Sequence, residues 1–395
     1  MFMPIQKLDQ HVKVHTFHLF PWTDVDTLEQ AEWPFEDVPY DAERAREFYE
    51  NSFEMIERAE ELGLDGAVFN EHHYSAYAMD PAPTLLASHL AARTETMSLG
   101  FLGNVVPIRG NPIRLAEELA VLDTISGGRV IAGMARGIPM EYLAYNVQDG
   151  PPGDGPDRSR EMFAEAVDLI VKAWTAEEPF DFDGEFWQYE NVYVWPKPYQ
   201  DPHPPMWMPA SSDPSIRIAA KHRIGIARPG DPEMARTGYE TYARFAEEEF
   251  GWTPTVEKFV MPKAVFVGQS REEAREAIRE HMAFAREYLF GGVHRGATAK
   301  MAGDEKWDPA KHRDKLAPHA VEFLDFDFDA AVDAGTIVVG EPEHVVAELE
   351  RQYEQIGGIG HLVCTLHHGD APHDATMESL ELFGEEILPE LHRLD

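Results

Sequence analysis

Four residues that could do acid–base or ligand chemistry, Asn70-Glu71-His72-His73, follow directly on the short apolar run "GLDGAVF". Parallel α/β proteins place their chemistry where buried strands end. Adjacent residues on an extended chain point to opposite sides, so His72 and His73 are poorly placed to share one metal ion. Imidazole exchanges protons near neutral pH, which favours acid–base catalysis by one of the two histidines. A hydrogen-bonded pair that only packs a strand end is the alternative.

The other candidate metal ligands are too few or wrongly spaced for a catalytic metal site. His15 and His18 lie three residues apart, and the histidine-rich stretch 367–374 lacks paired carboxylates at a matching spacing. The single cysteine, Cys364, lies in the apolar run "HLVCTL" and is expected to be a buried, inert thiol. We therefore expect no metal.

Two further strand ends carry groups suited to a phosphate. One apolar run ends at Arg136-Gly137, and another ends at Ser211-Ser212, just before a helix that begins near Asp213. A helix N-terminus offers unpaired N–H groups, the serines add donors, and an arginine fork would complete the site. Plain helix capping by the serines and a surface ion pair for Arg136 are the alternatives. Together the two strand ends indicate a phosphorylated ligand.

A third strand end, Gly103-Asn104, follows the apolar run 97–102. Glycine permits close or strained backbone geometry, so a flat ring could lie against this strand end. A β-bulge near the rim of the sheet is the alternative.

The elements that must position these residues alternate regularly between strand and helix. Uninterrupted alternation predicts a parallel sheet, and eight units in one long chain predict a single (β/α)₈ TIM barrel domain over 1–395. An open doubly wound sheet is the runner-up, but no GxGxxG follows the first strand. A hairpin-like excursion is expected near 180–205, and 291–338 is expected to be an irregular lid or disordered insertion. The strand patterns lie at 12–20, 65–70, 97–106, 129–135, 206–210, 224–227, 258–268 and 360–366.

The composition narrows the class of protein. The 395 residues are 44% hydrophobic, which is ample for a large core, and the net charge is −37 from 71 acidic and 34 basic residues. So acidic a protein repels nucleic acid and anionic lipid; a solvated acidic surface is the preferred interpretation, and a salt-rich cytoplasm is the alternative. The N-terminus lacks a signal-peptide pattern, and no apolar run approaches the roughly 18 residues of a membrane span. A cytoplasmic, soluble protein is expected.

Three stretches resemble the bacterial luciferase-like flavin monooxygenases: "NEHHYS", "GNVVPIRGNPIRLAEELAVLDTISGGRVIAGMARG", and the C-terminal "GIGHLVCTL" with "ESLELFGEEILPEL". The resemblance covers about 12–391, and 97–137 is its most specific block. It implies a (β/α)₈ barrel that takes reduced FMN from a partner flavin reductase and uses O₂. A C4a-peroxyflavin would then oxidise a small organic substrate. The resemblance also implies a homo-oligomer, a dimer or a tetramer.

The resemblance assigns roles to particular residues. His72 matches the active-site histidine. We predict His72 and Glu71 as the catalytic residues, and we expect either Glu71 or Asn70 to orient the His72 ring. The Leu102-Gly103 bond matches a non-proline cis peptide beneath the flavin. Ala135 replaces the reactive cysteine of luciferase, so no aldehyde preference carries over. The predicted cofactor-binding residues are Leu102, Gly103, Asn104, Arg136, Gly137, Ser211, Ser212 and Ser215.

Two other functions stay open. The same fold hosts F420-dependent dehydrogenases, which transfer hydride and do not activate O₂. Some relatives bind flavin without known turnover, although an intact His72 and a full set of phosphate ligands argue against a degenerate site.

Overall fold

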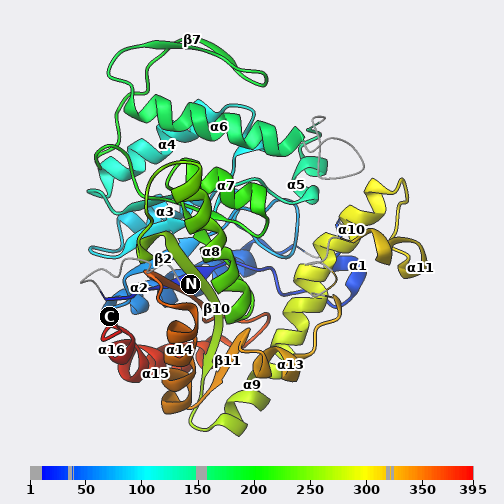
Figure 1. Ribbon diagram of the computed structural model, residues 1–395. Coiled ribbons are helices and arrows are strands. Elements are labelled where there is room, and N and C mark those ends of the chain that lie inside the picture. The colour runs from blue at the N-terminus through cyan, green and yellow to red at the C-terminus, as the bar shows by residue number, and fades with distance from the viewer. Residues whose placement is uncertain are drawn as a thin grey trace.

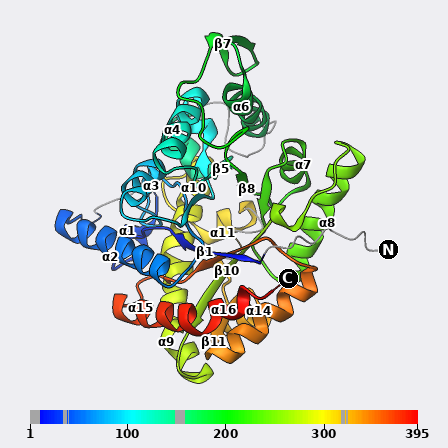
Figure 2. The ribbon, with the colours of Figure 1, turned by 90° about the vertical axis from the view of Figure 1, so that its left-hand side faces the viewer.

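Eight parallel strands close into a barrel in the computed structural model, which describes residues 11–33, 38, 40–147, 158–316, 321 and 324–394. Hydrogen bonds between the last and first strands close the ring, and Figure 2 shows the helices arranged around it. The closed barrel confirms the predicted fold class and excludes the open doubly wound sheet. In order around the barrel the strands are β1 (Lys13–His18), β2 (Gly66–Phe69), β3 (Ser98–Phe101), β5 (Val130–Ala135), β8 (Met206–Pro209), β9 (Gly225–Ala227), β10 (Phe259–Val267) and β12 (His361–Thr365).

The helices between the strands begin and end at local signals that the sequence contains. Asp41 caps the helix after β1 by accepting a hydrogen bond from the Arg44 N–H at 2.8 Å, and Gly63 follows its last turn with φ of +93°. Asn111 caps the helix after β3 in the same way. The main helices are α2 (Ala42–Glu61), α3 (Pro83–Ala91), α4 (Pro112–Ile125), α5 (Pro139–Ala144), α6 (Arg158–Thr175), α7 (Asp213–Lys221), α8 (Pro232–Glu248), α9 (Arg271–Phe284), α14 (Pro342–Ile356), α15 (His373–Leu382) and α16 (Leu388–Leu391).

Apolar side chains fill the barrel interior. The inward cluster is built around Trp207, and an imidazole pair, His15 and His361, lies beside it with 3.0 Å between ring nitrogens. Cys364 is buried on β12, and burial raises the pKa of its thiol, as expected for an inert cysteine. None of the helices in the described part of the chain is long and apolar enough to cross a membrane.

One strand was missing from the sequence prediction. β11 (Ile337–Gly340) pairs in parallel with the last four residues of β10, Ala264–Val267. The nine-residue β10 is longer than its barrel neighbours, so its end extends past the barrel and leaves an edge that β11 covers. The run "TIVVG" is short and follows a charged stretch, which hid its strand character.

The segment 291–338 is not irregular throughout, contrary to the sequence prediction. Helix α9 continues without a break through a π-helical turn, η3 (Ala285–Phe290), into α10 (Gly291–Met301). The glycines of α10 allow close packing: a Cβ on Gly296 would lie 1.5 Å from the carbonyl oxygen of Trp33. Shorter helices follow, and 317–320 and 322–323 lie outside the described residues. Movement of this segment as a lid stays a prediction.

The excursion near 180–205 contains an antiparallel hairpin. Its strands are β6 (Phe180–Asp183) and β7 (Gln188–Val192), and Figure 1 shows it extending away from the barrel beyond α4 and α6. The hairpin therefore lies away from the barrel mouth. The predicted site lies at the barrel mouth, where the barrel strands end.

Candidate active site

His72 lies in the loop that follows β2 and is held by two side chains. Its Nδ1 lies 2.7 Å from Oε1 of Glu141, and its Nε2 lies 2.9 Å from the side-chain nitrogen of Asn70. The ring is 9% exposed and packs against Tyr77 with 4.5 Å between ring centroids. Of the two orienting groups proposed from the sequence, Asn70 makes the contact and Glu71 does not.

Glu141, which the sequence analysis missed, is the carboxylate partner of His72. It is the third residue of α5, and its second oxygen accepts a hydrogen bond from the Ile138 N–H at 2.8 Å. The side chain is fully buried, so both oxygens obtain partners from within the protein. The available signal was Pro139 at a helix start with glutamate two residues later, a common N-terminal pattern.

These contacts define which nitrogen of His72 can exchange a proton. With Glu141 ionised, its oxygen accepts the Nδ1 proton. In the neutral ring Nε2 is then an acceptor for the Asn70 amide. A proton gained at Nε2 would leave a cation next to the Glu141 carboxylate, which stabilises it. The pair therefore has the geometry of an oriented acid–base group.

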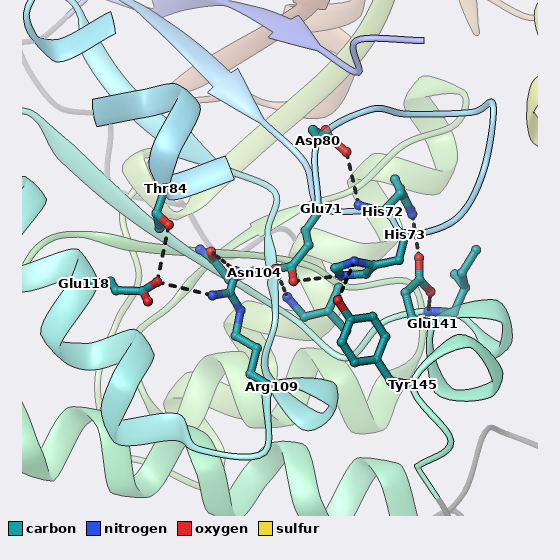
Figure 3. A network of polar contacts seen from close by, with 12 residues as sticks. Glu71, His72, His73, Asp80, Thr84, Asn104, Arg109, Glu118, Glu141 and Tyr145 are labelled. Carbon is teal, nitrogen blue, oxygen red and sulfur yellow. Dashed lines mark hydrogen bonds and ion pairs between the residues drawn. The ribbon is translucent and has the colours of Figure 1, made fainter. Parts of the chain in front are cut away.

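His73 points to a separate network. Its Nε2 lies 3.0 Å from Oε1 of Glu71, whose other oxygen accepts hydrogen bonds from the Val105 N–H at 2.8 Å and from Arg109 at 2.7 Å. The His73 Nδ1 lies 3.1 Å from the hydroxyl of Tyr145. Figure 3 shows this network beside that of His72. Glu71 thus holds the loop onto the ends of neighbouring strands, which makes it a positioning residue in this geometry.

Asp80 supports the backbone of the same loop. One of its oxygens accepts a hydrogen bond from the His72 N–H at 3.1 Å, while the other has no partner among the described residues. The carboxyl group is fully buried. Burial raises its pKa well above the usual value of 3.8. The loop that carries His72 therefore rests on a carboxyl group that resists ionisation.

The Leu102–Gly103 peptide bond is cis in the structure, as the resemblance implied. A Cβ on Gly103 would lie 2.8 Å from backbone atoms of Gly133 and Met134, so glycine is required for β3 and β5 to approach. The side chain of Asn104 donates to the Gly133 carbonyl at 2.9 Å and accepts from Arg109 at 3.1 Å. Its polar atoms are therefore engaged within the protein, and Leu102 is the member of this set that lines the barrel-mouth cavity.

The serines that were predicted to bind a phosphate contact a second arginine, Arg160. Arg160, on the first turn of α6, donates to the hydroxyls of Ser212 and Ser215, each at 3.1 Å. Arg136 donates to Ser159 at 3.2 Å, the residue next to Arg160. Arg160 thus joins the two serines that follow β8, and Arg136, which follows the adjacent strand β5, contacts the same first turn of α6.

Ser212 does not act as a capping side chain. It is the N-cap residue of α7, but its hydroxyl makes no capping hydrogen bond and instead contacts Arg160 and Ser215. The Ser212 hydroxyl therefore accepts no hydrogen bond from the first-turn N–H groups of α7. Ser211 is exposed. Helix capping alone therefore does not explain the serines at 211–215.

Gly137, which follows Arg136 at the other strand end, has φ of +86°, and a Cβ there would lie 2.5 Å from Val105.

Arg160 was absent from the sequence analysis because nothing local marks it. It stands in an ordinary helical stretch, 25 residues beyond Ala135, the last residue of β5. Only the fold brings the first turn of α6 next to the start of α7.

A cavity of about 530 Å³ lies at the barrel mouth. Its floor includes Leu102 and residues at the ends of β1, β8, β9 and β12, and its roof comes from α2 and the π-helical turn η3. This volume is in the range of small-molecule sites.

The described residues contain one group with the spacing of metal ligands, His11, Asp65 and His392. These residues come from the start of β1, the residue before β2 and the last turn of the described chain, so they lie at the opposite end of the barrel from His72. In the described part of the chain, the barrel mouth shows no such group.

Comparisons with known proteins identify the family of the chain. Residues 35–359 match the family model described as luciferase-like monooxygenase. The chain is 27% identical over 248 residues to the oxygenase component of flavin-dependent trigonelline monooxygenase from Acinetobacter baylyi, covering 62% of this chain and 66% of the relative. It is 24% identical over 371 residues to 2,5-diketocamphane 1,2-monooxygenase 2 from Pseudomonas putida, covering 87% and 94%.

Solved structures share the fold at lower identity. The oxygenating constituent of 3,6-diketocamphane monooxygenase from Pseudomonas putida, in complex with FMN, aligns with a TM-score of 0.73 at 21% identity over 96% of this chain and 98% of that chain. An F420-dependent secondary alcohol dehydrogenase aligns with a TM-score of 0.66 at 17% identity over 97% and 99%. At these identities the two likenesses show the fold alone.

Proposed function

Because the chain belongs to the luciferase-like monooxygenase family, we propose that it is the oxygenase component of a two-component, FMN-dependent monooxygenase. Reduced FMN, supplied by a partner flavin reductase, provides when bound the two electrons that reduce O₂, so that one oxygen atom enters a small organic substrate and the other leaves as water.

The observation that carries this proposal is the cluster of Arg136, Arg160, Ser212 and Ser215. Arg160 contacts the two hydroxyls at the start of α7, and Arg136, which follows the adjacent strand β5, contacts Ser159 beside Arg160. This donor set fits a phosphate dianion. The fit is pronounced in a protein of net charge −37, where an anionic cofactor needs concentrated local positive charge.

His72 would be the proton-handling group of the reaction. Glu141 orients the ring and stabilises a proton gained at Nε2, and the Asn70 amide holds Nε2 until a reactant replaces it. Tyr77 connects His72 to the cavity, since it packs on the His72 ring and also lines the barrel mouth. His72 would take a proton from the substrate adduct or donate a hydrogen bond to bound oxygen.

The relatives favour FMN over F420. Proteins matched along most of this chain carry names that state monooxygenase activity, whereas the F420-dependent neighbour shares the fold alone. The name of one relative, an oxygenase component, supports a separate reductase. An F420-dependent hydride transfer remains the second candidate, because a phosphate cluster would serve that cofactor too.

The segment 291–338 is proposed to act as a lid. The π-helical turn η3, which directly precedes this segment in the chain, lies on the side that faces the cavity. Ala285, Arg286, Leu289 and Phe290 of η3 line the cavity roof, and π-helical turns concentrate at functional sites. Limited proteolysis should first cut within 291–338, and FMN with substrate should slow the cut. Resistance of that segment in the flavin-free protein would count against a lid.

A reductase-coupled assay tests the proposal. The protein would be incubated with NADH, FMN, a flavin reductase, catalase and ¹⁸O₂, using a panel of bicyclic ketones and monoterpenes. We expect a product carrying one ¹⁸O atom that requires both the protein and the reductase. F420-dependent oxidation of an alcohol, with no ¹⁸O incorporation under any condition, would overturn the proposal in favour of the dehydrogenase.

A further inference from the structure

The polar side chains that line the barrel-mouth cavity are mostly engaged with other protein groups. Lys263 donates to the carbonyls of Gly230 and Gly335, at 2.9 and 2.7 Å. Nε2 of His368 lies 3.0 Å from the Val265 carbonyl oxygen. The remaining examples pair likewise: His18 with Thr16, His373 with Glu54, Asp370 with His281, and Arg44 with Asp24 and Glu47. Hydrogen bonds to a bound molecule must therefore come from the few groups that are left.

His367 is such a group. It lies just beyond the end of β12 and lines the cavity. Among the residues that the structure describes, it makes no hydrogen bond and no ion pair. His367 is half-buried, and part of its surface faces the cavity. A polar ring with open hydrogen-bonding positions inside a cavity is available to a ligand.

The ring is uncharged near neutral pH. Burial lowers the pKa of His367 to about 4 and that of the neighbouring His18 to about 3. A neutral imidazole carries one N–H donor and one nitrogen acceptor. His367 therefore offers directional hydrogen bonds to the cavity without carrying a net charge.

The rest of the lining is largely apolar. Rings and aliphatic chains from β1, α2 and η3 surround this position, and Leu102 marks the side on which the flavin ring is proposed to lie. A molecule held here would bury hydrocarbon surface against these groups and meet the neutral His367 ring. The main apolar groups are Phe17, Phe20, Met55, Tyr77, Leu289 and Phe290.

We infer that His367 is the substrate-orienting residue of this enzyme, and that it hydrogen-bonds a carbonyl or hydroxyl oxygen of an uncharged, mostly hydrocarbon substrate. The inference rests on the proposed function, since it deepens the substrate class of the same site. The hydrogen bond would turn one end of the molecule toward β12 and present the other to His72. Strand β1 alone separates β12 from β2, after which His72 lies.

Binding of a matched pair of ligands tests the inference directly. Camphor and bornane share one bicyclic skeleton and differ by the carbonyl oxygen, and equilibrium headspace measurement suits both because they are volatile. We expect the flavin-free wild-type protein to bind camphor. His367→Leu should weaken camphor binding about tenfold and leave bornane binding unchanged, whereas His367→Gln, which keeps a donor and an acceptor, should retain most of the camphor affinity.

His373→Leu is the matched control, because that ring lines the same cavity but is engaged with Glu54; it should keep the wild-type preference for camphor over bornane. Equal camphor affinity in wild type and His367→Leu, or equal losses for camphor and bornane, would overturn the inference. So would absence of camphor binding at millimolar concentration. Tighter binding of camphor-10-sulfonate than of camphor would also contradict it, and would assign the cavity to an anion facing Arg286. Because these measurements omit flavin, a failure to bind FMN would show up separately, as a failure of the proposed function.

Discussion

Two pairs of adjacent histidines end strands of the same barrel and have opposite surroundings. His72 and His73, after β2, each contact a buried carboxylate, Glu141 at 2.7 Å and Glu71 at 3.0 Å. His367 and His368, after β12, contact no carboxylate among the residues that the structure describes, and burial lowers the pKa of each to about 4. The difference shows that the partner decides what a buried imidazole can do. A carboxylate lets the ring hold an extra proton, and its absence leaves a neutral hydrogen-bonding ring.

The two sides of the barrel mouth are therefore proposed to have different roles in the reaction. The β2 side is proposed to handle protons, and the β12 side is proposed to orient an uncharged substrate. Substitutions that exchange or remove the partners should separate the two roles.

The largest effect is expected for His72→Ala. General acid–base groups typically contribute about 10²–10⁴-fold to rate, so substrate oxidation should fall by that factor while FMN affinity stays within about twofold. Steady-state assays with a reductase, combined with FMN titration, measure both quantities. His73→Ala is the control: it should lower thermal stability, because Glu71 and Tyr145 lose a partner. Substrate oxidation by His72→Ala at the wild-type rate would contradict the assignment of His72 as the acid–base group.

Glu141→Gln should lower the maximal rate about 10- to 100-fold, which is the range for losing a hydrogen bond to a charged group. The amide keeps the shape of the side chain but stabilises a protonated His72 less, so the pH–rate profile should also move to lower pH. A purely structural role for Glu141 would reduce the amount of folded enzyme without moving that profile. Measuring rate against pH for both proteins distinguishes the two cases.

Arg136→Ala and Arg160→Ala should each weaken FMN binding at least tenfold, about 1.4 kcal/mol for loss of a charge-assisted contact. Arg158→Ala is a matched control on the same first turn of α6, since Arg158 pairs with Glu185 at 2.9 Å and stacks on Phe186. Fluorescence titration with FMN measures all three. Unchanged affinity in both Arg136→Ala and Arg160→Ala would remove the phosphate site.

The smallest effect is expected for Asp80→Asn, and it depends on pH. Because the folded-state pKa of Asp80 is raised above 3.8, the folded protein binds this proton more tightly than the unfolded chain does. Stability from this group is fully present below about pH 4 and is lost as pH rises through the folded pKa. The variant should therefore be more stable than wild type near pH 8, and this gain should disappear near pH 4. Thermal unfolding at the two pH values checks this; a gain that is equal at both would show that Asp80 is not the titrating group.

The sequence predicted those features that local patterns encode. Strand ends such as Asn70–His73 and the Arg136 and Ser212 positions follow from apolar runs that stop at polar residues. The helix boundary at Asn111 follows from capping chemistry. The cis bond at Leu102–Gly103 came from the family resemblance alone, since no local physical signal in the sequence requires it.

The missed residues act across long distances in the chain. Glu141 meets His72 from 69 residues away, and Arg160 meets Ser212 from 52 residues away, so neither partnership leaves a mark in local sequence. The glycines of α10 were interpreted as a sign of irregular structure, but at Gly292 and Gly296 they admit the backbone of residues 31–33. Tertiary packing, which a local pattern does not report, decides both outcomes.

The central claim is tested most directly by equilibrium titration of one protein preparation with reduced FMN and with reduced F420, each added under anaerobic conditions. The account predicts that reduced FMN binds at least tenfold more tightly than reduced F420, that Arg160→Ala weakens FMN binding at least tenfold, and that His72→Ala leaves FMN binding nearly unchanged. Tighter binding of F420, unaffected by Arg160→Ala, would contradict the account.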